Sequence, residues 1–252
     1  MNQLNNMRIL LLGGSGKLGK AIKNNSDFDY ISMPTSIECN LLEVKSIINT
    51  IKKNSPTHII NCAAEARRKV CQNDPIKAIS VNTIGTANLV QSIISLNSAN
   101  KRVPRLIHIS TDAVYKDKPG LNKESDPTIP LCSYGWTKLA AECSVRLLQD
   151  YLIIRTRFYS PEDIPFEDAA VDIKTSSMPI EKLSLLITKL TKINYNGVIN
   201  IGSESMSDFQ RYRLCKPSIR PASRLEIENH SGLPFSSDYS MSLSLMHKIL
   251  HT

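Results

Sequence analysis

The sequence predicts an α/β fold, a doubly wound parallel sheet with a small C-terminal lobe, and three observations support this prediction. Short apolar runs alternate with segments of helical periodicity along most of the chain. A glycine-rich turn at 13–19 directly follows the first apolar run. The chain has 252 residues, of which 41% are hydrophobic, so it can bury the core that such a sheet requires.

The first part of the chain alternates strand and helix. The apolar run at 8–12 predicts a strand buried on both faces, and a helix follows the glycine turn. A strand at 29–33, a helix at 42–51 and a strand at 58–62 come next, with Ser55-Pro56 as the helix break. This order of elements is typical of a parallel sheet.

The second part continues the alternation and then loses it. Helices are predicted at 75–96, 134–149 and 179–192, and strands at 106–110, 151–155 and 197–202. The remaining residues are rich in Pro, Ser and Asp and predict irregular segments over the carboxyl ends of the strands, where open α/β sheets bind ligands. The predicted dinucleotide-binding domain is therefore 1–158, completed by 179–203, and the predicted substrate-binding lobe is 159–178 and 204–252.

Composition narrows the functional classes. No apolar run reaches the roughly 18 residues of a membrane span, and the polar start of the chain lacks a secretory signal, so we expect a cytoplasmic protein without membrane contact. The six cysteines form no C-x-x-C pair, which favours packed thiols over a metal site or disulfides. The net charge of +8 is dispersed apart from the cluster at 67–69, which favours small phosphate-bearing ligands over nucleic acid.

The glycine turn predicts a dinucleotide-binding site. Gly13, Gly16 and Gly19 leave room where a side chain would collide with a pyrophosphate or with the next element. The helix that follows Gly16 directs its free N–H groups and its positive dipole end towards the phosphates. Because the turn lies between a predicted strand and a predicted helix, it indicates a Rossmann-type fold rather than a structural turn.

The region after the second predicted strand bears on the choice of cofactor. An acidic residue usually accepts the ribose hydroxyls of NAD there, and residues 31–36 contain none. The hydroxyls of Thr35 and Ser36, with Lys17 nearby, could instead receive a 2′-phosphate, although a solvated loop would explain Thr35 and Ser36 equally well. We therefore expect NADP(H) in preference to NAD(H).

A reactive cluster is predicted at the start of the helix at 134–149. Tyr134 and Lys138 are four residues apart and therefore share a helix face. A nearby ammonium favours the phenolate, so we expect Lys138 to lower the pKa of Tyr134 towards working pH and make it a proton donor. Ser110, Thr111 and Asp112 end the preceding strand, where their side chains could hold a carbonyl oxygen.

These motifs together resemble the extended short-chain dehydrogenases/reductases, and most closely the dTDP-4-dehydrorhamnose reductase family. The resemblance runs, in order, through 13–19, 61–64, 81–82, 110–112, 124–131, 134–139, 154–156 and, more loosely, 238–243. It implies reduction of the C4 ketone of a nucleotide-linked deoxysugar for cell-surface polysaccharide synthesis, with Thr111, Tyr134 and Lys138 as the catalytic triad. Ala113 replaces the acidic residue of the related dehydratases, which argues against dehydration.

The motifs and the resemblance together predict which residues line the two ligand sites. The expected cofactor-binding residues are Gly13, Ser15, Gly16, Lys17, Leu18, Gly19, Thr35, Asn40, Leu41, Cys62, Ala63, Ala64, Asn82, Ser110, Tyr134 and Lys138. The expected substrate-binding residues are Arg67, Thr111, Asp112, Arg155 and Arg157.

Several alternatives stay open at this point. Arg67 or Arg68 could bind a diphosphate or carboxylate or could end a solvated helix, and an internal salt bridge would explain Arg155 and Arg157 equally well. The histidines at 58 and 108 are expected in the core or behind the site. An epimerase, with Cys132 as its added acid or base, and a non-catalytic regulator like the related subunit of methionine adenosyltransferase are the competing functions. A homodimer is a further option.

Overall fold

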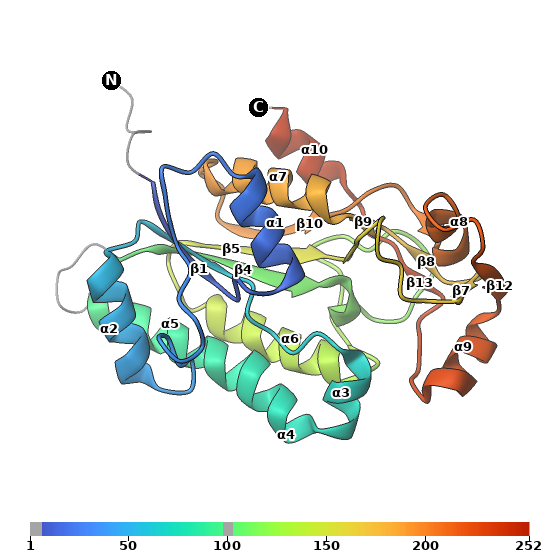
Figure 1. Cartoon of the computed structure of the whole chain (residues 1–252), viewed down its shortest axis with the longest axis horizontal. Helices are drawn as coiled ribbons and strands as arrows, with labels where there is room; N and C mark the ends of the chain where they lie inside the picture. The colour runs from blue at the N-terminus through green and yellow to red at the C-terminus, as the bar shows by residue number, and fades with distance from the viewer. Residues whose placement is uncertain (1–6, 98–102, 252) are drawn as a thin grey trace.

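The computed structural model describes residues 7–97 and 103–251. Its centre is a sheet of six parallel strands in the order β10-β5-β4-β3-β1-β2 (Figure 1). The strands are β1 (Arg8–Leu12), β2 (Tyr30–Ser32), β3 (His58–Asn61), β4 (Arg105–Thr111), β5 (Tyr151–Thr156) and β10 (Gly197–Ile201). The predicted parallel sheet of Rossmann type is confirmed.

Helices cover both faces of this sheet, as Figure 1 shows. On one face lie α1 (Lys17–Asn25), α7 (Ile180–Thr191) and α10 (Ser244–Leu250), and on the other lie α2 (Val44–Asn54), α5 (Gly85–Asn97) and α6 (Ser133–Val145). Alternate side chains of β1 point to opposite faces of the sheet. Ile9 and Leu11 pack in the core between the sheet and helices α1 and α7, whereas Leu10 and Leu12 pack in the core between the sheet and helices α2 and α5. The sheet is therefore doubly wound.

The helix predicted at 75–96 has a more complex form. It consists of α4 (Pro75–Ala78), a π-helical segment (Ile79–Ile84) and α5, and the unpredicted short helix α3 (Arg68–Asn73) precedes it. Asp74 separates the two short helices because its side chain accepts a hydrogen bond from the Lys77 N–H. The π-helical segment contains Asn82, and such segments are frequent at functional sites.

The C-terminal segments are more ordered than the sequence predicts, and the expectation of irregular chain was wrong for much of them. Short strand pairs join β6 (Phe158–Tyr159) to β9 (Met178–Pro179) and β7 (Asp168–Ala170) to β12 (Arg220–Ala222), and β8 (Lys174–Thr175) lies between β11 (Met206–Ser207) and β13 (Asp238–Tyr239). Two further helices are α8 (Asp208–Arg213) and α9 (Arg224–Ser231). Figure 1 shows this layer beyond the carboxyl ends of the central strands.

A recognisable signal precedes both of these helices. Ser207 with Gln210, and Ser223 with Glu226, form capping boxes in which each side chain bonds the other residue's backbone N–H. Helix α10 instead returns to the large sheet, where Met246 and Ile249 join its core. Within the described residues, no helix has the length and apolar character needed to cross a membrane. The division into two domains stays a prediction.

Candidate active site

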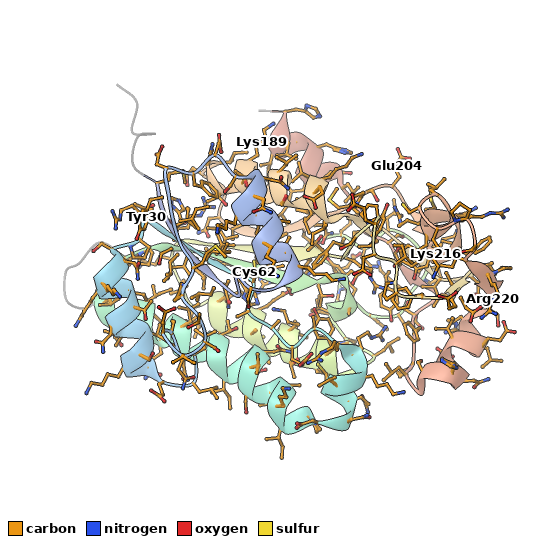
Figure 2. All side chains as sticks on the ribbon, in the orientation of Figure 1. Tyr30, Cys62, Lys189, Glu204, Lys216 and Arg220 are labelled. Carbon is orange, nitrogen blue, oxygen red and sulfur yellow. The ribbon has the colours of Figure 1, made fainter. Side chains whose placement is uncertain are left out.

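The glycine turn brings the end of β1 against the end of β3. Gly13 has a φ of +75°, and a Cβ there would lie 2.5 Å from the Ala63 nitrogen. A Cβ on Gly19 would lie 2.5 Å from the Gly13 oxygen. Figure 2 shows Cys62 close to the start of α1, which lacks a side-chain cap at Gly16. The turn therefore leaves backbone N–H groups free beside a surface that only glycine allows.

We expect Gly13→Ala to destabilise the protein strongly. The left-handed conformation costs a non-glycine residue roughly 1–2 kcal/mol, and the collision with Ala63 adds about 1–3 kcal/mol. Urea unfolding measures the sum. Gly232→Ala is the matched control because Gly232 has a φ of +70° with nothing within 4 Å of its Cβ position, so it carries the backbone cost alone. Equal losses in the two variants would contradict the close approach of β1 and β3.

The other residues expected around the cofactor have varied surroundings. The Leu18 side chain is buried in the core, and Lys17 Nζ lies 2.6 Å from Asp163 of the C-terminal lobe. The Thr35 N–H and hydroxyl both donate to Glu38, at 2.8 Å and 3.0 Å, and this lowers the pKa of Glu38. Although residues 31–36 contain no acidic residue, the Glu38 carboxylate therefore lies against Thr35. Lys17 is paired with Asp163 rather than with Thr35.

Asn40 and Leu41 shape the turn before α2. Asn40 Oδ1 accepts a hydrogen bond from the Leu42 N–H at 3.0 Å, and its Nδ2 donates to Glu43 at 2.9 Å. The Leu41 side chain is half-buried, and its carbonyl accepts a hydrogen bond from Asn88. Neither side chain is free in this structure to bind a ligand without giving up a contact.

Asn82 is fully buried, and all of its polar atoms are bonded within the protein. Its Oδ1 accepts the Glu65 N–H at 2.8 Å, and its Nδ2 donates to the Glu65 carbonyl at 3.1 Å and to Thr137 Oγ1 at 3.0 Å. It therefore joins the loop after β3 to α6. Asn82 therefore positions the loop that contains Ala63 and Ala64, and it does so from behind the expected cofactor groove.

Thr111 and Tyr134 meet at the carboxyl end of β4. A hydrogen bond with Thr111 and the Arg157 charge favour the Tyr134 phenolate, but burial outweighs both and raises the pKa of Tyr134. The expectation that Lys138 lowers this pKa was wrong for the protein without ligands. The reason is geometric: Lys138 Nζ points into the sheet and lies 3.1 Å from His108 Nε2.

Lys138 has an unusual environment for a lysine. Its side chain is 1% exposed, and burial lowers its pKa to about 8, against the charge of Glu142, which raises it. Cys62, which directly follows β3, is half-buried against the core, and burial raises its pKa to about 12. The amine therefore reaches its midpoint of protonation near pH 8, whereas the Cys62 thiol stays protonated there.

Two ion pairs hold the residues expected to face the substrate. Arg155 Nη2 lies 2.7 Å from Glu142 Oε2, both side chains are 1% exposed, and Ser110 donates to the same carboxylate at 2.5 Å. Arg157 forms a bidentate pair with the buried Asp112, at 2.6 Å and 3.1 Å. Internal ion pairs thus explain both arginines. Arg157 differs from Arg155 in that its side chain is 21% exposed and its charge favours the Tyr134 phenolate.

The basic cluster at 67–69 divides between two partners. Arg67 folds back onto Glu65, with Nη2 2.6 Å from Oε2. Arg68 reaches the C-terminal lobe instead, where it donates to the Pro234 carbonyl at 2.8 Å and lies 4.2 Å from the centre of the Phe235 ring. Phe235 and Tyr134 pack in the same apolar cluster, so Arg68 lies closer to the reactive group than the sequence indicates.

Sequence reasoning missed Glu38, Glu142 and the partnership of His108 with Lys138. Glu142 has a detectable signal, because an acid four residues after Lys138 on a buried helix needs a cation. No such signal links His108 to Lys138. Across residues 7–97 and 103–251, no group of three or more His, Cys, Asp or Glu side chains could hold a metal ion.

Comparisons with known proteins agree with this geometry. The family model described as the RmlD substrate binding domain matches residues 7–163. A curated dTDP-4-dehydrorhamnose reductase from Aggregatibacter actinomycetemcomitans is 30% identical over 155 residues, which are 59% of this chain and 50% of that protein. Methionine adenosyltransferase 2 subunit beta from Pongo abelii is 30% identical over 149 residues, or 56% of this chain and 43% of that protein. The matches thus span about half the length of these relatives.

Solved structures show the same fold over the whole chain. A dTDP-4-dehydrorhamnose reductase from Bacillus anthracis in complex with NADP has a TM-score of 0.84 at 21% identity, covering 96% of this chain and 92% of that one. A hypothetical dTDP-4-dehydrorhamnose reductase from Sulfolobus tokodaii has a TM-score of 0.80 at 24% identity, covering 98% and 96%. From the family match over most of its length, the chain belongs to the RmlD substrate binding domain family, as the resemblance to dTDP-4-dehydrorhamnose reductases predicts.

Proposed function

We propose that the chain binds NADP(H) and reduces the C4 ketone of a nucleotide-linked deoxysugar in the synthesis of cell-surface polysaccharide. One observation carries the proposal: the glycine turn after β1 and the Thr111–Tyr134 pair after β4 lie at the same edge of one parallel sheet. Ligands of open α/β sheets bind at this edge. The family membership and the names of the curated relatives support the same reaction.

The residues of the turn fit a dinucleotide. Gly13 and Gly19 have no side chain at positions where a Cβ would collide with neighbouring atoms, so the backbone of the turn is uncovered. The N–H groups at the start of α1 are available to bind a pyrophosphate. A bound reduced nicotinamide supplies the hydride for the ketone carbon. Thr111 would hold the ketone oxygen, Tyr134 would protonate it as negative charge develops, and Lys138 would bind the nicotinamide ribose once its amine leaves His108 Nε2. The raised pKa of Tyr134 keeps the phenol protonated in the protein without ligands, so its proton is available for the developing alkoxide.

Arg157 and Arg68 are the arginines best placed for the substrate. Arg157 lies beside Tyr134 and packs 4.4 Å from the centre of the Tyr239 ring, and Arg68 contacts Phe235 in the same apolar cluster. Arg67 and Arg155 are occupied by ion pairs with Glu65 and Glu142, and Asp112 orients Arg157 through the ion pair between them. We assign Arg157 and Arg68 to substrate binding, and Arg67, Arg155 and Asp112 to positioning of neighbouring groups.

The choice of NADP(H) over NAD(H) is open to a direct test. Thr35 is proposed to face the 2′-phosphate, and the Glu38 carboxylate bound to Thr35 repels a dianion there. We expect Glu38→Gln to tighten NADPH several-fold and to leave NADH nearly unchanged, as measured by fluorescence titration of both nucleotides. Glu167→Gln, in the C-terminal lobe, is the control. An equal gain for both nucleotides would remove Thr35 from the 2′-phosphate site.

A non-catalytic regulatory role is the competing function, and the match to a subunit of methionine adenosyltransferase favours it. The deciding experiment supplies NADPH and a panel of nucleotide-linked 4-keto-6-deoxysugars and follows the absorbance of the reduced nicotinamide. Oxidation that depends on the sugar supports the reductase. Tight NADPH binding without oxidation by any of the sugars would favour the regulator.

A further inference from the structure

A buried contact between Lys138 and His108 lies beneath the proposed active site. Lys138 Nζ, from α6, is 3.1 Å from His108 Nε2, from the middle of β4, and the two residues are 1% and 0% exposed. Water therefore cannot supply the hydrogen bonds of either group, and each depends on the other for its partner. The arrangement of protons in this contact must follow from the surrounding protein.

Asn61 determines which nitrogen of His108 has the proton. The Ala63 backbone N–H can only donate, and it donates to Asn61 Oδ1 at 3.1 Å. This contact fixes the amide orientation and turns Asn61 Nδ2 towards His108 Nδ1, at 3.4 Å. An amide nitrogen is a donor, so His108 Nδ1 accepts, and the neutral imidazole has its proton on Nε2.

The Nε2 proton points at Lys138, which creates a conflict with a charged lysine. A neutral amine has a lone pair and accepts the Nε2–H, so the whole chain of contacts from Ala63 to Lys138 is satisfied. An ammonium group has only donors, so it can bond Nε2 only after the ring proton has moved to Nδ1, where it opposes the Asn61 amide. Protonation of Lys138 and the tautomer of His108 are therefore linked.

We propose that His108 is a positioning residue whose tautomer, set by Asn61, controls whether Lys138 is an amine or an ammonium group. With the Nε2–H tautomer, Lys138 is a neutral amine held under the sheet edge. With the Nδ1–H tautomer, it is an ammonium group bonded to Nε2. This proposal concerns the free protein, and its importance for catalysis rests on the proposed reductase function, in which Lys138 binds the nicotinamide ribose.

Burial and neighbouring ionisable groups shift the pKa values of Lys138 and His108. Burial lowers the pKa of Lys138 to about 8, and the Glu142 carboxylate on the same helix opposes this by raising it. The thiol of Cys62, which directly follows β3, stays neutral in this range because burial raises its pKa to about 12. Burial and the Lys138 charge hold the pKa of His108 well below 6.5, so the ring stays neutral while Lys138 titrates. The event near pH 8 is thus a proton gained by Lys138 together with a tautomer change of His108, without an imidazolium.

Nuclear magnetic resonance of the free protein tests the proposal in the wild type. Lysine labelled with carbon-13 at Cε and histidine labelled with nitrogen-15 in the ring are followed from about pH 6 to about pH 10. The lysine signal is assigned by its loss in Lys138→Met. We expect Lys138 to titrate near pH 8 and the His108 ring to change from Nδ1–H below that midpoint to Nε2–H above it. One unchanged tautomer across this range would overturn the proposal.

Two variants and a control extend the test. In Asn61→Asp the carboxylate accepts Nδ1–H, so His108 should stay in that tautomer at every pH and the Lys138 midpoint should rise by about one pH unit or more. In His108→Gln an amide oxygen can accept from the ammonium group, and the midpoint should rise as well. His58→Gln, at the amino end of β3, should leave both signals unchanged. A retained tautomer switch in Asn61→Asp would contradict the role of Asn61.

The NADPH affinity of the same proteins separates this inference from the proposed function. If the two residues are linked, NADPH binding weakens as the pH rises through the Lys138 midpoint. In Asn61→Asp this loss of affinity should occur at a higher pH, and the midpoint of the lysine signal should rise by the same amount. If the wild type shows the tautomer switch but binds no NADPH, the proposed function fails and the linkage stands. If NADPH binds but neither signal moves in the variants, the linkage fails and the cofactor site stands.

Discussion

Tyr134→Phe is expected to remove the NADPH-dependent reduction of a nucleotide-linked 4-keto sugar almost completely. The variant loses the only group proposed to protonate the ketone oxygen, and loss of a positioned general acid costs about 10²–10⁴ in rate. The phenyl ring preserves the packing of Tyr134 with Ala113 and Tyr239. The rate constant kcat should therefore fall far more than the NADPH affinity, and both kcat and the NADPH Kd are measured in the variant and the wild type.

A matched control separates this loss from a general effect of removing a hydroxyl. Tyr151→Phe makes the same change at the start of β5, at the opposite edge of the sheet, and should keep full activity. Retention of more than a small part of the rate in Tyr134→Phe would show that another group or a water molecule protonates the oxygen. The proposed role of Thr111 as a partner of that phenol would then fall as well.

Glu142→Gln is expected to be the most destabilising single change outside the glycine turn. It leaves the Arg155 guanidinium 1% exposed without its carboxylate, and it weakens the hydrogen bond from Ser110. Removing one partner of a buried ion pair costs about 3–5 kcal/mol in the free energy of unfolding. Urea denaturation measures it.

Two further variants show whether the loss comes from the unpaired charge. The double variant Glu142→Leu with Arg155→Met replaces the pair by apolar side chains and should recover much of the stability. Glu167→Gln disrupts a pair whose acidic side chain is 70% exposed and should change stability little. If the double variant is as unstable as Glu142→Gln, the lost packing rather than the buried charge is the cause.

The large sheet could be predicted from the sequence because its strands are buried on both faces and read as apolar runs. The run at Ile9 to Leu12 divides between two cores, which is the reason for its continuous apolarity. The C-terminal lobe could not be predicted because its strands are two or three residues long and their pairing depends on distant segments. The capping boxes at Ser207 and Ser223 were the one local signal there.

The candidate site was predictable in its residue types but not in its contacts. Four-residue spacing places Tyr134 and Lys138 on one helix face, yet it does not say where a long lysine side chain ends. Here a buried histidine of the neighbouring strand competes for the amine, so the expected effect on the Tyr134 pKa is absent. The expectation that Arg67 binds the substrate meets a similar difficulty, because its guanidinium group is paired with Glu65, two residues away.

The most direct test of the proposed reduction follows the hydride itself. The chain is incubated with nucleotide-linked 4-keto-6-deoxysugars and with NADPH that has deuterium at both positions of the nicotinamide C4. The sugar product is analysed by nuclear magnetic resonance and mass spectrometry. The proposed mechanism predicts one deuterium at C4 of the sugar, and none when Tyr134→Phe replaces the wild type. Deuterium at another carbon, or no labelled sugar despite NADPH binding, would contradict it.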